Sequence, residues 1–282
     1  MNRTATFVMT RERTWVLTAV SVLLFILLCG IFADGLFTPP LWNGEAWIAS
    51  PLITYLLILA IVLAGWSQAR SIPTTGIALR LERDPAALGQ VNDPVGWRLL
   101  MGNIYFALFW LPMRFFLGRD WLSHGAQKLV DPAWMNGGQA LRGFWERAVV
   151  VPETGRPAIT YDWFRQLLQY MLDHGWYTWF AKLVVWGEVL VGLGLLVGAL
   201  VGLSAFVGTF MNFNYMLAGS ASTNPVLFGL AVFLVLASKV GGHWGLDRRL
   251  LSALGTPWAR AEAQVEAIAA RAEREAVTST AR

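Results

Sequence analysis

Two ionisable side chains, Arg114 and Glu188, stand inside stretches of sequence that are otherwise apolar. A charge at the depth of a lipid bilayer costs about 2.5–3.5 kcal/mol on insertion scales, so such residues usually pair, face a helical bundle or handle protons and ions. A carboxylate beside an arginine can exchange a proton when a ligand binds, and the same pair can also fix the register of two helices. These two residue types therefore point to either a functional site or a structural ion pair.

The composition is typical of an integral membrane protein. Of the 282 residues, 56% are hydrophobic and only 14% are charged, whereas about 25% of the residues in a soluble domain are charged. Mean hydropathy is +0.49. Many of the 15 Trp residues stand near the ends of apolar runs, as in the aromatic belts of membrane interfaces. The expected partner is the lipid bilayer, and the net charge of +4 indicates cytoplasmic Arg and Lys, not nucleic-acid binding.

Cys29 is the one cysteine of the sequence, and it lies in the first apolar run. A single cysteine excludes an intramolecular disulfide, a cysteine-ligated iron–sulfur cluster and a covalently attached c-type haem. Redox chemistry in this chain would therefore use a partner or a bound cofactor such as a quinone, with no covalently bound group.

Six apolar runs predict an all-α polytopic membrane protein with six transmembrane helices, because about 20 helical residues cross a hydrocarbon core roughly 30 Å thick. Arginines are concentrated before the first run, in the segment 67–98 and after the last run. This distribution predicts that both termini are cytoplasmic. The expected location is the cytoplasmic (inner) membrane of a bacterium or archaeon. The six runs are 15–32, 47–66, 99–117, 179–196, 201–217 and 225–240.

The same runs predict the domain organisation. The segment 161–180 has apolar residues at helical spacing, so we expect an amphipathic helix that leads into the fourth span and either lies at the outer interface or covers a pocket. The expected units are an N-terminal transmembrane hairpin (1–66), a cytoplasmic linker (67–98), a membrane domain (99–250) with an extracytoplasmic insertion (131–178), and a cytoplasmic tail (251–282).

The depths of the two buried charges can be estimated from the helical rise. If the third helix begins inside at Leu99, Arg114 lies about 22 Å along it, and Glu188 lies about 14 Å below the outer end of the fourth helix at 1.5 Å per residue. These depths predict an Arg114–Glu188 pair in the outer half of the bundle, with Arg114 and Glu188 as candidate catalytic residues. Further polar residues near the outer side are candidates for substrate or quinone binding: His124, Lys128, Asn212, Asn214 and Asn224.

Three blocks of sequence resemble the DoxX/DoxD family of membrane proteins. The first is Arg114 with Gly118 and 124-HGAQKL-129, the second is 187-GEVLVGLGLLVG-198, and the third is 241-GGHWGLD-247. The resemblance covers residues 99–250 and implies a DoxX-like four-helix bundle as the core.

The resemblance implies a subunit of a membrane oxidoreductase that acts on the quinone pool, similar to the large subunit of thiosulfate:quinone oxidoreductase. Glu188 would then exchange protons, Arg114 would stabilise a reduced, anionic quinone or hold an anionic sulfur substrate, and Lys128 with His124 would attract thiosulfate. The alternative is a non-catalytic structural or assembly subunit of a respiratory or photosynthetic complex, bound to other membrane or periplasmic subunits. A small-solute transporter is a third reading, although no internal inverted repeat is visible.

Overall fold

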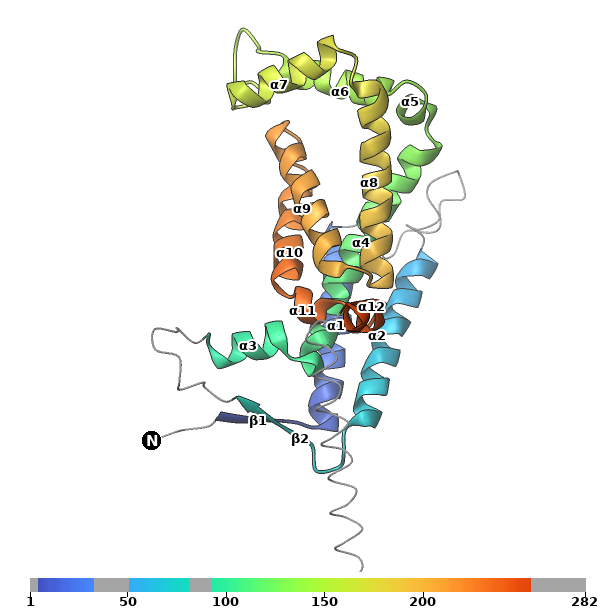
Figure 1. Cartoon of the computed structure of the whole chain (residues 1–282), viewed down its shortest axis with the longest axis vertical. Helices are drawn as coiled ribbons and strands as arrows, with labels where there is room; N and C mark the ends of the chain where they lie inside the picture. The colour runs from blue at the N-terminus through green and yellow to red at the C-terminus, as the bar shows by residue number, and fades with distance from the viewer. Residues whose placement is uncertain (1–4, 33–50, 82–92, 255–282) are drawn as a thin grey trace, which may run out of the picture.

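The computed structural model describes residues 5–32, 51–81 and 93–254, and these are mostly helical (Figure 1). Within these ranges, three helices are long and apolar enough to cross a membrane, or four if one bent pair of helices forms a single span. These helices support the membrane character expected from the composition. The predicted tail after residue 254 and the loop between the first two runs lie outside the described residues.

The N-terminal part is a pair of packed helices, α1 (Arg11–Phe32) and α2 (Pro51–Ser71). α2 continues five residues beyond the predicted end of the second run at residue 66. An antiparallel pair of strands, β1 (Ala5–Met9) and β2 (Ile77–Leu81), closes the end of the pair from which α1 starts (Figure 1). The sequence analysis did not predict this small sheet, of which β2 lies in the expected linker and β1 in the expected N-terminal unit.

The third apolar run is not one helix, contrary to the prediction. It forms α3 (Val95–Gly102), the 3₁₀ helix η2 (Ile104–Trp110) and α4 (Leu111–Val130), with a bend of 78° after Gly102. Asn103 stands at the break in extended conformation, and its side-chain oxygen accepts a hydrogen bond from the backbone N–H of Tyr105 at 3.0 Å. Such a cap starts a new helix and ends the old one. Arg114 consequently lies in the first turn of α4.

The centre of the molecule is the pair formed by α4 and α8 (Tyr177–Val197), which run side by side (Figure 1). The two backbones approach closely at glycines. A Cβ atom on Gly192 would stand 2.5 Å from the backbone nitrogen of Leu122, and one on Gly125 would stand 2.8 Å from that of Val189. Small residues permit this kind of contact between membrane helices.

The remaining helices complete the bundle. The α8–α9 connection is tight, with Gly198 and Leu200 in left-handed conformation. The fifth run matches α9 (Val201–Leu217), while the sixth is divided into α10 (Asn224–Leu236) and α11 (Ser238–Gly241), followed by α12 (Asp247–Ala253).

The insertion forms a helical cap over the end of α4 and α8 opposite the β1–β2 sheet (Figure 1). It contains α5 (Pro132–Met135), α6 (Gln139–Val149) and α7 (Asp162–Asp173). Phe164, Leu168 and Met171 of α7 are buried in a core that the cap shares with Ala181 of α8 and with Ala218 after α9. Trp163 and Leu167 are exposed, so the predicted apolar face of this helix is buried only in part. The expected continuous helix into the fourth span is wrong, because the chain turns between α7 and α8, with Gly175 at φ +67°.

Candidate functional site

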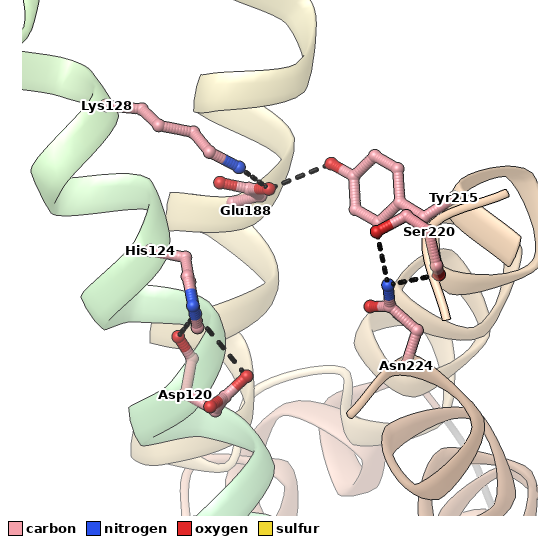
Figure 2. Close-up of polar contacts among 7 residues, drawn as sticks. All are labelled: Asp120, His124, Lys128, Glu188, Tyr215, Ser220 and Asn224. Atoms are coloured by element: carbon pink, nitrogen blue, oxygen red, sulfur yellow. Dashed lines mark hydrogen bonds and ion pairs between the residues drawn. The ribbon is translucent and has the colours of Figure 1, made fainter. Parts of the chain in front are cut away.

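Glu188 lies in the middle of α8 and is the centre of a polar cluster that joins three helices. Its side chain is only 1% exposed. One carboxylate oxygen, Oε1, accepts hydrogen bonds from Nζ of Lys128 on α4 at 2.5 Å and from the hydroxyl of Tyr215 on α9 at 2.8 Å (Figure 2). A buried carboxylate with a cationic partner and a second donor is the arrangement that a charge needs at this depth. We call Glu188, Lys128 and Tyr215 the Glu188 cluster.

The helix geometry explains why these three side chains meet. Lys128 stands in the last turn of α4, one turn after Gly125, where the backbone of α8 is in close contact. Its ammonium group also lies 4.8 Å from the ring centroid of Trp134 in the cap, a distance at which an aromatic face attracts a cation. The Lys128 side chain is 22% exposed, so the cluster extends from the bundle interior to the cap.

Several polar atoms next to the cluster are buried and have no hydrogen-bond partner within the described chain. They are Oε2 of Glu188, Nε1 of Trp121, and both Oδ1 and Nδ2 of Asn212. The rings of Trp121 and Tyr215 lie 6.3 Å apart, and Nε1 of Trp121 faces Gly208, one helical turn before Asn212. Leaving such a group unsatisfied costs about 1–3 kcal/mol, so each calls for a ligand or a water molecule.

Arg114 does not pair with Glu188, which corrects the prediction. Its Nη1 donates to the carbonyl oxygen of Gly241 at 3.1 Å and its Nη2 to that of Trp244 at 2.8 Å. Arg114 precedes Lys128 by fourteen residues on the same helix, about 21 Å along the axis at 1.5 Å per residue. The depth estimate failed because it assumed a straight helix from Leu99.

Arg114 belongs instead to a second polar group that fixes the segment 241–247. Asp247 in this segment is fully buried, and its carboxylate accepts hydrogen bonds from the backbone N–H groups of Leu200 at 2.6 Å and Val201 at 2.9 Å. It therefore caps the start of α9, where the helix dipole favours a negative charge. Arg114 and Asp247 together hold this segment against α4 and the α8–α9 turn.

The other candidate residues make local contacts, and those of His124 and Asn224 are drawn in Figure 2. Nδ1 of His124 lies 2.9 Å from the carbonyl oxygen of Asp120, and the His124 side chain is 56% exposed. Asn214 donates to the carbonyl of Phe210 at 2.8 Å, and Asn224 donates to that of Ser220 at 2.9 Å. Of the predicted site residues, the structure thus brings together Lys128 and Glu188 and buries Asn212, while His124, Asn214 and Asn224 bond within their own segments.

The sequence analysis did not identify Tyr215 and Trp121, although the spacing of residues along α4 and α9 could have indicated both. One face of α4 and one face of α9 carry residues separated alternately by four and three positions, the spacing of a helix–helix contact. Trp121 stands between Gly118 and Gly125, which both pack closely against α8. Tyr215 follows Asn212 by three positions. The faces are Arg114, Gly118, Trp121, Gly125 and Lys128 on α4, and Val201, Ala205, Gly208, Asn212 and Tyr215 on α9.

The buried donors and the acceptor beside Glu188 have the chemistry that the carbonyl oxygens of a quinone need. Within the described residues, no group of three His, Cys, Asp or Glu side chains could hold a metal. A quinone presents two carbonyl oxygens that accept hydrogen bonds. Nε1 of Trp121 and Nδ2 of Asn212 are buried donors with no partner in the described chain, and Oε2 of Glu188 can take up or release a proton.

No family model, curated protein or solved structure gives a significant match to this chain. The DoxX/DoxD resemblance accordingly stays a prediction that rests on its three motif blocks.

Proposed function

We propose that the chain is a subunit of a membrane oxidoreductase that acts on the quinone pool, with Glu188 as the residue that exchanges protons. The supporting observation is the environment of its carboxylate: Oε1 is held by Lys128 and Tyr215, while Oε2 is buried with no partner in the described chain. One oxygen fixes the group in place, and the other is left for a proton. The Arg114 role suggested by the family is not part of this proposal, because Arg114 bonds elsewhere.

The residues around Glu188 have separable roles in this proposal. When bound, a quinone supplies the redox chemistry by accepting two electrons and two protons. Nε1 of Trp121 and Nδ2 of Asn212 orient it by donating hydrogen bonds. Glu188 delivers or accepts a proton at Oε2, and Lys128 stabilises the charged carboxylate that remains. Because Lys128 is partly exposed beside the cap, protons exchange with the outer side.

The proposed reaction also needs an electron donor, and the contacts of Lys128 and His124 bear on which donor it is. The DoxD resemblance implies thiosulfate, attracted by Lys128 and His124. In the structure Lys128 is paired with Glu188, and His124 contacts Asp120, so neither charge stands ready for an external anion. We therefore propose that electrons arrive through a partner subunit that docks on the membrane domain.

The proposal also assigns the helices to transmembrane spans. We propose that α3, η2 and α4 together form the third span, and that α9 and α10–α11 supply the fifth and sixth. Together with α8, these elements would make a DoxX-like four-helix bundle. The packing of α4 on α8 and of α9 on α10 supports this arrangement.

A non-catalytic assembly subunit is the second candidate, and the cap supports it. Trp163, Leu167 and Tyr170 form an exposed face on α7, separate from the face buried in the cap. Such a face can dock another subunit. Purification from native membranes separates the candidates: a stoichiometric partner without bound quinone would favour assembly.

The test of the proposed function uses the complex purified from native membranes. Lipid extracts of the wild-type complex are expected to contain quinone. We expect Glu188→Gln to slow quinone turnover by at least about a hundredfold, the usual loss when a positioned acid or base is removed. Glu146→Gln, the same change at an exposed residue of the cap, should leave turnover unchanged. Extracts without quinone, or a folded Glu188→Gln complex with normal turnover, would refute the proposal.

A further inference from the structure

A pocket far from the Glu188 cluster lies between the start of α1 and the end of α2. It is an open depression on the surface, with a volume of about 400 Å³. It opens at the end of the molecule that carries the β1–β2 sheet, the side on which the arginine distribution predicts the cytoplasm. The lining residues are Arg11, Trp15, Trp66, Ala69 and Arg70.

The two arginines of this pocket are held in place by the protein. Nε of Arg11 donates to the carbonyl oxygen of Ile72 at 2.7 Å, which uses one of the five N–H donors of a guanidinium. The guanidinium carbon of Arg70 lies 4.2 Å from the ring centroid of Trp66, so the indole face supports the cation. Among the residues that the structure describes, the lining has two positive charges and no carboxylate, so its charge favours an anion.

The surface beyond the pocket is apolar and follows both helices. Exposed large side chains recur every three or four residues, so each helix presents one continuous apolar stripe that starts near the pocket. A free anion would use the pocket alone, whereas an amphiphile would use the pocket and the stripes. The stripes contain Val16, Val20, Leu23, Leu27 and Ile31 on α1, and Leu52, Leu56, Leu59 and Leu63 on α2.

We propose that this pocket binds the phosphate group of an anionic phospholipid from the cytoplasmic leaflet. The phosphate lies between Arg11 and Arg70, because a guanidinium can donate two parallel hydrogen bonds to phosphate oxygens. The acyl chains lie along the two stripes, and Trp15 and Trp66, which are 44% and 45% exposed, stand at the level of the glycerol backbone. Basic pockets between transmembrane helices bind anionic headgroups in this way.

The experiment measures lipid binding to the purified full chain by native mass spectrometry. The probes are phosphatidylglycerol, phosphatidylcholine and inorganic phosphate. The test variant is Arg11→Gln with Arg70→Gln, and the control is Arg147→Gln with Arg249→Gln, which removes the same charge from exposed positions outside the pocket. Arg70→Gln alone is included because it leaves the bond between Arg11 and Ile72 intact.

The wild type is expected to prefer phosphatidylglycerol over phosphatidylcholine. The double variant should bind phosphatidylglycerol roughly twentyfold more weakly, the single variant about fivefold more weakly, and the control like the wild type, given the usual contribution of a basic residue near an anionic lipid. If the single and double variants keep wild-type binding, or if the wild type shows no preference, the proposal is wrong. If inorganic phosphate displaces the lipid at equal concentration, the site takes a free anion and the lipid assignment is overturned.

Discussion

At the scale of single residues, the two charges that stand out in the sequence have different partners and different roles. Oε1 of Glu188 accepts hydrogen bonds from Lys128 and Tyr215. Arg114, at the opposite end of α4 from Lys128, donates hydrogen bonds to two backbone carbonyls of the segment 241–247. Their presence in apolar runs was enough to mark both as buried and partnered. Their pairing was not predictable, because it depends on the bend at Asn103, which changes where α4 begins.

Lys128 should be necessary for the stability of the bundle. In Lys128→Met, Glu188 keeps only the Tyr215 hydroxyl as a partner, and breaking a buried pair in this way costs about 3–5 kcal/mol. We expect the lower end of this range because Lys128 is partly exposed. Thermal unfolding in detergent measures the loss. The double variant Lys128→Met with Glu188→Gln should recover most of it, and a double variant as unstable as the single one would contradict the pairing.

Arg114 should affect stability and leave quinone turnover unchanged. Lysine has no planar fork, so Arg114→Lys cannot reach both the Gly241 and Trp244 carbonyls, and one bond to a charged donor contributes about 1.5–3 kcal/mol. Unfolding measurements check the loss, and Arg142→Lys in the exposed cap serves as the matched control. Turnover per folded molecule should equal that of the wild type. A specific loss of turnover would place Arg114 in the reaction and contradict the separation of the two groups.

At the scale of elements, the apolar runs predicted α8 and α9 almost to the residue. These helices are long and bounded by clear signals, such as Gly198 at the turn. The third run failed because hydropathy does not register a side-chain cap, and the Asn103–Tyr105 bond breaks the helix inside an apolar sequence. The α7–α8 break was missed for a similar reason, since the apolar spacing continues through the turn at Gly175.

The contact of α4 with α8 should be sensitive to a single methyl group. In Gly192→Ala the new Cβ would stand 2.5 Å from the backbone nitrogen of Leu122, so the helices must separate, at a cost of about 1–3 kcal/mol. Gly229→Ala on α10 is the control, because nothing lies within 4 Å of its Cβ position and alanine favours a helix. Unfolding of both variants in detergent gives the comparison. Equal stability of the two would mean that α4 and α8 are not packed as closely as described.

At the scale of the whole molecule, the charge pattern predicts which end faces the cytoplasm. The β1–β2 end should be cytoplasmic and the cap, at the opposite end, extracytoplasmic (Figure 1). The Glu188 cluster reaches the cap through the contact between Lys128 and Trp134. The sequence could predict this sidedness from its arginines. It could not predict that the insertion folds into a cap over a buried core, because that core depends on contacts of α6 with α7 and with α8.

Labelling with a membrane-impermeant maleimide checks the sidedness. Cys29 is fully buried, so the wild type should stay unlabelled and serve as the background. Gln166→Cys, at an exposed position of α7, should react in intact cells with a permeable outer layer. Ser71→Cys, at the exposed end of α2, should react only after lysis. The opposite pattern would invert the orientation and place the proton exchange on the cytoplasmic side.

The most direct test of the central claim is an infrared difference spectrum of the purified protein between its quinone-bound and quinol-bound forms. Glu188 is expected to change protonation between the two, so the spectrum should contain a carboxylic-acid band that shifts in heavy water. The band should vanish in Glu188→Gln and persist in Glu146→Gln. A spectrum without such a band, or one in which the band survives in Glu188→Gln, would contradict the claim that Glu188 exchanges protons with the quinone.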